Sequence, residues 1–217
     1  NAKEATSFGI LKANEKNVIT SFIEKPKKEI LSEWVSDTGA LMQSQGRNYL
    51  ASMGIYVFNT DFLYEQLIRD HDTSGSSHDF GKDIIPSSIN KYRVYAYPFR
   101  DVQSGKQSYW RDVGTVDAFW EANLELIGVT PQLNLYDKDW PIWTYQRQLP
   151  PAKFVFNDEG RRGMAIDSMV SGGCIISGSQ LTKTLLFSNV RIHSFSTVEE
   201  SVILPGVVIN RHCKIRR

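Results

Sequence analysis

The sequence lacks the long apolar segments and the one-sided charge that mark membrane and nucleic-acid-binding proteins. No apolar run approaches the roughly 18 residues that span a bilayer, and the polar opening Asn1–Glu4 is not followed by the apolar core of a signal peptide. The 25 lysine and arginine residues nearly balance the 24 aspartate and glutamate residues, which leaves a formal net charge of +1. Charge therefore favours neither nucleic acid nor a membrane surface as a partner, and we expect a cytoplasmic location.

Cysteine is also scarce, since the chain holds only Cys174 and Cys213. Their spacing matches no zinc-binding pattern, and we expect two buried, reduced thiols of a cytosolic protein. The chain has no initiator methionine, and it stops at Arg217 inside a repeating pattern. Both features indicate a piece of a longer protein.

The composition itself is that of an ordinary globular protein, with 41% hydrophobic and 23% charged residues among 217. Strand-like runs alternate with helical patterns through the first half, which predicts an α/β sheet. The expected strands are 8–13 and 18–24, joined by a turn at 14–17, and the runs 52–58 and 94–99. The expected helices are a short one near 30–34, one capped by Thr60 or Asp61, one at 83–89 and one capped by Thr115.

From Val170 onward an apolar residue recurs every five or six positions. The series is Val170, Ile176, Leu181, Leu186, Ile192, Val198, Leu204, Ile209 and Ile215. A helix with 3.6 residues per turn cannot produce this spacing, whereas short strands with a corner about every six residues can. The series resembles the hexapeptide repeats of left-handed parallel β-helices, in which each coil buries its apolar row by stacking on the next. A meandering β-sandwich is the alternative.

These patterns divide the chain into three expected parts. Residues 1–129 form the α/β domain, and residues 152–217 form the β-helix. Residues 130–151 read as an ordered linker, because aromatic side chains such as Trp140 and Trp143 are rarely left in solvent.

Residues suited to an anionic, hydroxylated ligand occur at the ends of predicted elements. Glu24 and Lys25 close a strand, and Pro26 stops further pairing. A lysine fixed there offers a point charge to a phosphate, and a carboxylate accepts hydrogen bonds from sugar hydroxyls. Ser52 and Tyr56 share one face of the run 52–58 by the period of two, so both hydroxyls can point at one substrate. Taken singly, each of these features also fits a solvated turn or a core strand.

Two later segments carry further candidates. His78 is a possible general base, but no nucleophile motif accompanies it; Asp79 and Phe80 fit better as a hydroxyl acceptor and a sugar-stacking ring. Asp112 stands between a strand-like run and the helix start at Thr115, where ligands of α/β sheets bind. A carboxylate there suits Mg²⁺, which takes one or two carboxylates together with phosphate oxygens and water. A cap or turn residue is the structural alternative for this aspartate.

The order of these segments resembles that of the sugar-nucleotidyltransferase family. The segments are Phe-x-Glu-Lys-Pro at 22–26, Ser-Met-Gly-Ile-Tyr-Val-Phe at 52–58, His-Asp-Phe-Gly-Lys-Asp-Ile-Ile-Pro at 78–86 and Tyr-Trp-Arg-Asp-Val-Gly-Thr at 109–115. Leu-Pro-Pro-Ala-Lys-Phe at 149–154 and Ser-Gly-Gly-Cys-Ile-Ile-Ser-Gly at 171–178 make the chain most similar to the bacterial glucose-1-phosphate adenylyltransferases within that family.

This resemblance implies that residues 1–129 are the C-terminal, sugar-phosphate side of a Rossmann-like nucleotidyltransferase domain. The implied reaction converts ATP and glucose 1-phosphate to ADP-glucose and pyrophosphate, in glycogen biosynthesis. Lys25 and Asp112 are the implied catalytic residues, with Asp112 one of two carboxylates that hold Mg²⁺. The implied substrate-binding residues are Glu24, Lys25, Ser52, Tyr56, Asp79, Phe80 and Trp110. Members of the family are typically homotetramers regulated by sugar phosphates and nucleotides.

One departure from the family is large, and three alternatives stay open. The glycine-rich ATP-binding loop, Gly-x-Gly-x-Arg, and the first metal-binding aspartate do not occur in this sequence, so we expect the chain alone to be inactive. The first alternative is a related enzyme for another base or sugar. The second is a hexapeptide acyltransferase that uses His193 or His212. The third is a non-catalytic assembly or regulatory module, in which Arg161, Arg162, Arg191 and Arg211 are the residues able to meet anionic effectors.

Overall fold

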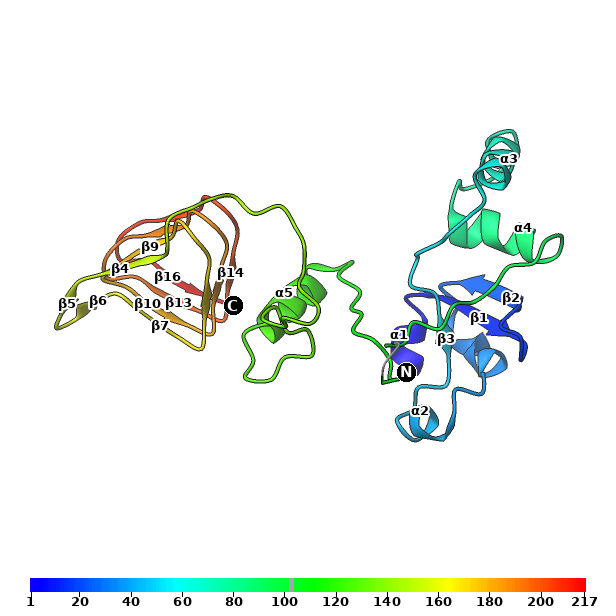
Figure 1. Ribbon diagram of the computed structural model, residues 1–217, viewed down its shortest axis with the longest axis horizontal. Helices are drawn as coiled ribbons and strands as arrows, with labels where there is room; N and C mark the ends of the chain where they lie inside the picture. The colour runs from blue at the N-terminus through cyan, green and yellow to red at the C-terminus, as the bar shows by residue number, and fades with distance from the viewer. Residues whose placement is uncertain (102–103) are drawn as a thin grey trace. The chain divides into compact units, whose positions relative to one another are not determined.

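The structure, a computed structural model, describes residues 1–101 and 104–217, and these fall into two compact units. The first unit is Asn1–Arg100 and the second is Asp101–Arg217 (Figure 1). This division comes earlier than the expected boundary after residue 129. The physical reason is helix α5 (Val116–Glu125), which packs within the second unit, where the Trp120 indole nitrogen donates to the Glu200 carbonyl at 2.8 Å.

The first unit is built on the predicted hairpin. Strands β1 (Gly9–Ala13) and β2 (Ile19–Glu24) pair antiparallel, which confirms the expected strands and turn. The Asn14 side chain closes the turn by accepting from the backbone N–H groups of Lys16 and Val18, both at 3.0 Å. A two-residue strand, β3 (Leu50–Ala51), pairs with the other edge of β1 and completes the order β2-β1-β3.

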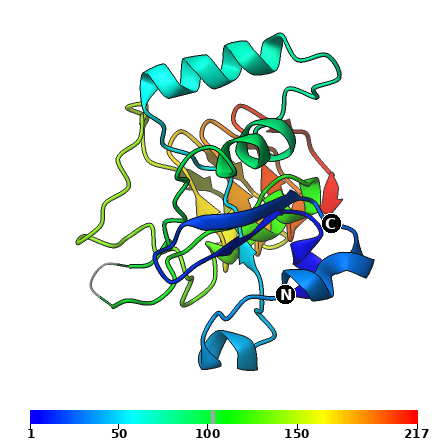
Figure 2. The ribbon, with the colours of Figure 1, turned by 90° about the vertical axis from the view of Figure 1, so that its right-hand side faces the viewer.

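Helical elements cover both faces of this small sheet (Figures 1 and 2). On one face Ile10 packs with Ala5 and Leu31, and on the other Leu11 and Phe22 pack with Ile85, as the alternation of side chains along a strand requires. The helices of the unit are α1 (Ala2–Ala5), the 3₁₀ helix η1 (Lys28–Trp34), α2 (Ala40–Ser44), α3 (Thr60–His71), the π-helical turn η2 (Phe80–Ile84) and α4 (Ile85–Ile89).

Helix α3 differs from the expectation at its start, and its buried residues are polar. Asn59, not Thr60 or Asp61, precedes the first helical residue, and its side chain makes no capping bond. The apolar residues Leu67 and Ile68 of the helix are 38% and 63% exposed. The buried residues of the helix are the polar Gln66 and Asp70 instead, and of these Asp70 makes side-chain bonds, to Ser76 and His78.

Two of the predicted strands are wrong. Regular pairing of β3 stops at Ala51, one further bond joins the Ser52 N–H to the Gly9 carbonyl, and Gly54 (φ +70°) turns the chain. The run 94–99 contributes only an isolated bridge between Val18 and Tyr95. In the described residues no further strand pairs with the outer edges of these runs, and without a partner a strand pattern cannot form a ladder.

The second unit contains a parallel β-helix, as the repeat predicted. Figure 1 shows its short strands stacked into three faces. The sheet orders are β16-β13-β10-β7, β14-β11-β8 and β15-β12-β9-β4, and a small hairpin pairs β5 with β6. The strands are β4 (Lys153–Val155), β5 (Asn157–Asp158), β6 (Arg161–Arg162), β7 (Met164–Ile166), β8 (Met169–Val170), β9 (Ile175–Ser177), β10 (Gln180–Thr182), β11 (Leu185–Leu186), β12 (Arg191–Ile192), β13 (Thr197–Glu199), β14 (Val202–Ile203), β15 (Val208–Ile209) and β16 (Lys214–Arg216).

The interior of the coil is the predicted apolar series with one correction. Ile176, Leu181, Leu186, Ile192 and Val198 have no exposed surface, and Ile209 is buried. The prediction that Leu204 points inward is wrong, because Leu204 is 52% exposed. Its neighbour Ile203 is the inward residue and is only 9% exposed. Cys174 is buried as expected, whereas Cys213 is only partly covered.

The segment 130–151 differs from the packed linker that its aromatic residues predicted. It contains no helix or strand, and its aromatic residues are not packed. Trp140 and Trp143 are 70% and 90% exposed. Within the two described ranges, no helix is long and apolar enough to cross a membrane.

Candidate active site

The end of β2 places two opposite charges side by side at an abrupt change of direction. Lys25 adopts a left-handed backbone conformation (φ +47°), held by its N–H bond to the Phe8 carbonyl at 3.1 Å, and Pro26 behind it is buried. A left-handed lysine before a proline is strained, and such strain persists only where the surroundings impose it. The Lys25 ammonium lies 3.8 Å from the Glu24 carboxylate and is mostly exposed. The cation is therefore free to meet a ligand beside a largely covered carboxylate.

The Glu24 carboxylate fits between two glycines. A Cβ atom on Gly9 would lie 2.7 Å from Glu24 Oε2, and one on Gly81 would overlap the same oxygen. Burial is the main effect that raises the pKa of Glu24 above its ordinary value; nearby Asp79 raises it further, while Lys25 and Lys82 oppose the shift. The two glycines thus make the space that the carboxylate needs, and they bring it close to the start of η2.

Asp79 organises that start. Its side chain accepts hydrogen bonds from the N–H groups of Gly81 (2.8 Å) and Lys82 (3.0 Å), as a capping residue does. Phe80 follows it, 36% exposed and stacked on Tyr56 with ring centroids 5.9 Å apart. The expected hydroxyl acceptor is therefore engaged in capping through Oδ1, and the expected sugar-stacking ring forms part of an aromatic wall.

Ser52 and Tyr56 do come together, although the run that carries them is not a regular strand. Their hydroxyl oxygens lie 3.2 Å apart, and Ser52 Oγ also accepts from the Gly54 N–H at 3.2 Å. Through the Tyr56–Phe80 stack this hydroxyl pair is continuous with the start of η2. The first unit therefore gathers six of the expected site residues: Glu24, Lys25, Ser52, Tyr56, Asp79 and Phe80.

Trp110 and Asp112 belong to the second unit. Asp112 is exposed and accepts a hydrogen bond from the Gly114 N–H at 3.1 Å, just before Thr115 caps α5 by accepting from the Ala118 N–H. Trp110 is partly covered. Across residues 1–101 and 104–217, no group of three histidine, cysteine, aspartate or glutamate residues could hold a metal ion, so Asp112 is not part of such a group.

Sequence reasoning missed three residues of the site. Gly9 and Gly81 shape the Glu24 pocket, and Lys82 is a second cation close enough to lower the pKa of Glu24. Gly81 and Lys82 do stand in the quoted run 78–86, beside residues that received roles. No local signal marks Gly9, since the approach of strand and loop that makes it necessary is a long-range contact.

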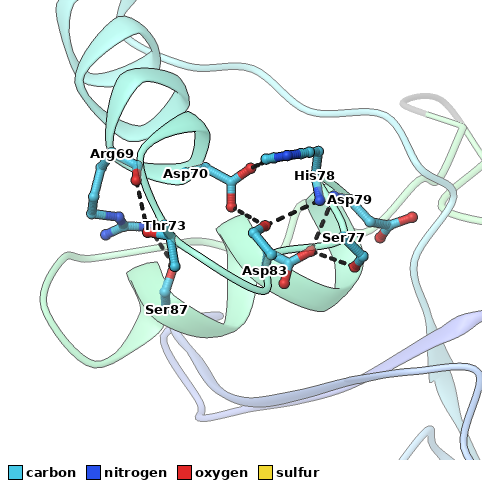
Figure 3. A network of polar contacts seen from close by, with 9 residues as sticks. Arg69, Asp70, Thr73, Ser77, His78, Asp79, Asp83 and Ser87 are labelled. Carbon is cyan, nitrogen blue, oxygen red and sulfur yellow. Dashed lines mark hydrogen bonds and ion pairs between the residues drawn. The ribbon is translucent and has the colours of Figure 1, made fainter.

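The histidines have other surroundings than the expectations gave them. Nδ1 of His78 lies 2.9 Å from a carboxylate oxygen of Asp70 (Figure 3). In the β-helix His212 stacks on the Phe195 ring with centroids 5.0 Å apart. Arg161, one of the arginines considered for anion binding, lies over the Phe156 ring at 3.5 Å and donates to the Ser194 hydroxyl at 3.1 Å. The contacts of His212 and Arg161 hold corners of the coil together.

Comparison with protein-family models gives two matches. A nucleotidyl transferase model matches residues 1–128, and a model of the GlmU-like C-terminal hexapeptide matches residues 150–217. The first match covers the α/β part and the second covers the β-helix, and residues 129–149 lie between them.

Comparison with curated proteins gives relatives named glucose-1-phosphate adenylyltransferase. The chain is 61% identical to that of Methylococcus capsulatus over 214 residues, which is 99% of this chain and 48% of the relative. It is 61% identical to that of Nitrosococcus oceani over 216 residues (99% and 49%), and 53% identical to that of Dechloromonas aromatica over 217 residues (99% and 47%). The chain thus spans about half the length of the curated relatives it matches.

Proposed function

The chain belongs to the nucleotidyl transferase family, and on that premise we propose that it is part of a glucose-1-phosphate adenylyltransferase. The whole enzyme would convert ATP and glucose 1-phosphate to ADP-glucose and pyrophosphate. The observation that carries this proposal is the gathering, around the end of β2, of Glu24, Lys25 and Lys82 with the Ser52 and Tyr56 hydroxyls. The names of the aligned relatives support the same substrate.

The chemistry suits this set of side chains. A phosphate oxygen of glucose 1-phosphate would attack the α-phosphorus of ATP, a new phosphorus–oxygen bond would form, and the bond to the leaving pyrophosphate would break. No covalent enzyme intermediate is needed, so the protein's task is to position the reactants and to neutralise phosphate charge. Lys25 and Lys82 supply positive charge for the sugar phosphate, and Glu24 with the two hydroxyls supplies acceptors and donors for the glucose ring.

Asp112 is the residue of this chain suited to hold Mg²⁺. It offers one exposed carboxylate, and Mg²⁺ ordinarily takes one or two carboxylates and completes its shell with phosphate oxygens and water. A bound Mg²⁺ would neutralise charge on the triphosphate. We expect Asp112→Asn in the whole protein to lower kcat and to raise the Mg²⁺ concentration that gives half-maximal rate. Wild-type values for both would remove Asp112 from the metal site.

The experiment that tests the function is a substrate panel on the whole protein. Pyrophosphate release is measured with ATP and glucose 1-phosphate, and with GTP and mannose 1-phosphate as the competing pair. We expect the first pair to give the higher kcat/KM. A preference for the second pair would replace the proposal by another sugar-1-phosphate nucleotidyltransferase. We expect the 217-residue chain alone to release no pyrophosphate, since it carries no Gly-x-Gly-x-Arg loop.

The wider roles follow from the proposed activity. ADP-glucose is an activated glucosyl donor, which fits a cytoplasmic enzyme of glycogen biosynthesis. The β-helix presents no charged residue in its core and contributes none of the gathered site residues, so we propose that it serves assembly of a homotetramer and its regulation. Sedimentation of the whole protein with and without residues 150–217 would test assembly, and an unchanged oligomeric state would contradict it.

A further inference from the structure

The segment between α3 and η2 is composed like a mobile loop, yet the structure ties it down. Residues 72–79 are rich in serine, threonine and glycine, and most of them are exposed. Loops of this composition usually have low local stability. This one ends on Asp79 and Phe80, at the start of η2 beside Glu24, so its order bears directly on the geometry of the candidate site.

Two carboxylates from the flanking helices hold the loop (Figure 3). Asp70, in the last turn of α3, accepts from the Ser76 hydroxyl at 2.7 Å and pairs through its other oxygen with Nδ1 of His78 at 2.9 Å. Asp83, in η2, accepts from the Ser77 hydroxyl at 2.7 Å and from the Asp79 N–H at 3.1 Å. Every residue from Ser76 to Asp79 therefore has a bond to one of the two carboxylates.

The Asp70–His78 pair has the features of a fixed link rather than a chance surface contact. The Asp70 side chain is only 9% exposed, and the hydrogen bonds from Ser76 and His78 hold its pKa below the ordinary value, so it is a carboxylate at neutral pH. A carboxylate only accepts, so Nδ1 of His78 must donate. His78 also sits in the left-handed backbone region (φ +55°), a conformation that is costly for most side chains. The bond to Asp70 offsets that strain.

Displacement of the loop would reach Glu24. The Asp79 side chain accepts from the Gly81 N–H at 2.8 Å, and Gly81 is so close to the Glu24 carboxylate that a Cβ atom would not fit. A shift of His78 therefore moves Asp79, then Gly81, and then the space in which Glu24 lies.

We propose that Asp70 and His78 are positioning residues, which hold the Asp79–Gly81 segment in register with Glu24 for binding of the sugar phosphate. This inference rests on the proposed function. Nδ1 of His78 is engaged with Asp70, and the imidazole acts on substrate binding indirectly, through Asp79 and Gly81.

The test separates the hydrogen bond from the backbone conformation. In the whole protein, His78→Gly keeps the left-handed conformation and removes the donor, whereas His78→Asn tolerates that conformation and keeps an N–H donor near the position of Nδ1. We expect His78→Gly to raise the KM for glucose 1-phosphate roughly tenfold, about the worth of one hydrogen bond to a charged group. The KM for ATP should change by less than about twofold, and His78→Asn should restore most of the loss. His71→Asn, an exposed neighbour whose ring centroid lies 6.5 Å from that of His78, is the matched control and should behave as wild type.

Hydrogen exchange without substrate gives a second readout on the same purified variants. We expect faster exchange in the peptide covering residues 72–83 for His78→Gly and Asp70→Asn, and wild-type exchange in the β-helix. Equal effects of His78→Gly and His78→Asn on both KM values, or unchanged exchange in 72–83, would overturn the positioning role. Failure of the proposed function is a separate result, because it would show as absent wild-type turnover with ATP and glucose 1-phosphate. The hydrogen-exchange experiment would still decide whether Asp70 and His78 hold residues 72–83 in place.

Discussion

The β-helix and the first unit place their important side chains by different means. In the coil, each apolar position repeats in the next coil: Leu181 pairs with Val198, and Val198 with Ile215. In the first unit, the site residues stand where regular structure ends: Glu24 and Lys25 lie at the end of β2, and Asp79 caps η2. The coil is specified by a local repeat, whereas the candidate site is specified by contacts between segments far apart in the sequence. Mutations in the coil should therefore act mainly on stability, whereas mutations in the candidate site should also change ligand binding.

The largest effect is expected in the core of the coil. Ile192 is fully buried and stacks between Ile176 and Ile209. Ile192→Ala should lower the free energy of unfolding of the whole protein by about 2–5 kcal/mol, through lost burial and the cavity left behind. Leu204→Ala, at the exposed position, is the control and should change it by less than about 0.5 kcal/mol. Urea unfolding measures both, and similar losses for the two variants would contradict the assignment of Ile203 as the inward residue.

The next largest effect is expected in the candidate site of the first unit, on binding of the sugar phosphate. Lys25→Ala in the whole protein should raise the KM for glucose 1-phosphate by roughly ten- to a hundredfold, as expected for loss of a charge-assisted contact. The KM for ATP should change much less, and the free energy of unfolding should stay close to that of wild type because the ammonium is mostly exposed. An unchanged KM for the sugar phosphate would remove Lys25 from the site.

How much of the coil and of the candidate site could be predicted from the sequence depends on whether local or long-range contacts specify each of them. The spacing of Ile176, Leu181 and Ile192 is enough to predict the coil, because each strand meets a copy of its own pattern. It could not choose between Ile203 and Leu204, which are adjacent and both apolar, because the corner positions shift by one residue where the step is five instead of six. Ser52 and Tyr56 do lie together, but the turn at Gly54 brings their hydroxyls within 3.2 Å, and the strand spacing from which this was predicted does not occur.

The failures have a common physical cause in long-range pairing. The runs 52–58 and 94–99 carry strand patterns, but a ladder needs a neighbour, and Ile55 and Val57 remain exposed at 72% and 98%. The roles of Gly9 and Gly81 depend on where Glu24 packs, which no local pattern contains. Trp140 and Trp143 were expected to be covered because aromatics usually are, and composition does not say what covers them.

A moderate effect is expected where strand and loop meet at Glu24. Gly81→Ala should weaken sugar-phosphate binding and lower stability by about 1–3 kcal/mol, because the added methyl group and the carboxylate cannot share the space. In a Glu24→Ala background the same change should cost little stability, since the conflicting oxygen is gone. The two single variants and the double variant form a cycle that urea unfolding can measure. Additive losses would show that Gly81 is required for another reason.

The smallest effect is expected in the pH dependence of stability. It concerns two carboxylates of the first unit, Glu24 and Asp70, whose pKa values shift in opposite directions. Burial raises the pKa of Glu24 above its ordinary 4.5, so the folded state binds a proton more readily and stability falls as the pH rises through that range. Bonds from Ser76 and His78 lower the pKa of Asp70 below its ordinary 3.8, so its stabilisation is present above that pH and is lost as the pH falls through the folded value.

Substitution should therefore change stability with opposite signs. At about pH 7, Glu24→Gln should raise the free energy of unfolding and Asp70→Asn should lower it; at about pH 4, the first difference should nearly vanish and the second should persist. Urea unfolding of the whole protein at the two pH values measures both, with hydrogen exchange in peptides of residues 1–100 to locate the change. The same sign for both variants at about pH 7 would mean that Glu24 is stabilised as a carboxylate, in contradiction to its burial between Gly9 and Gly81.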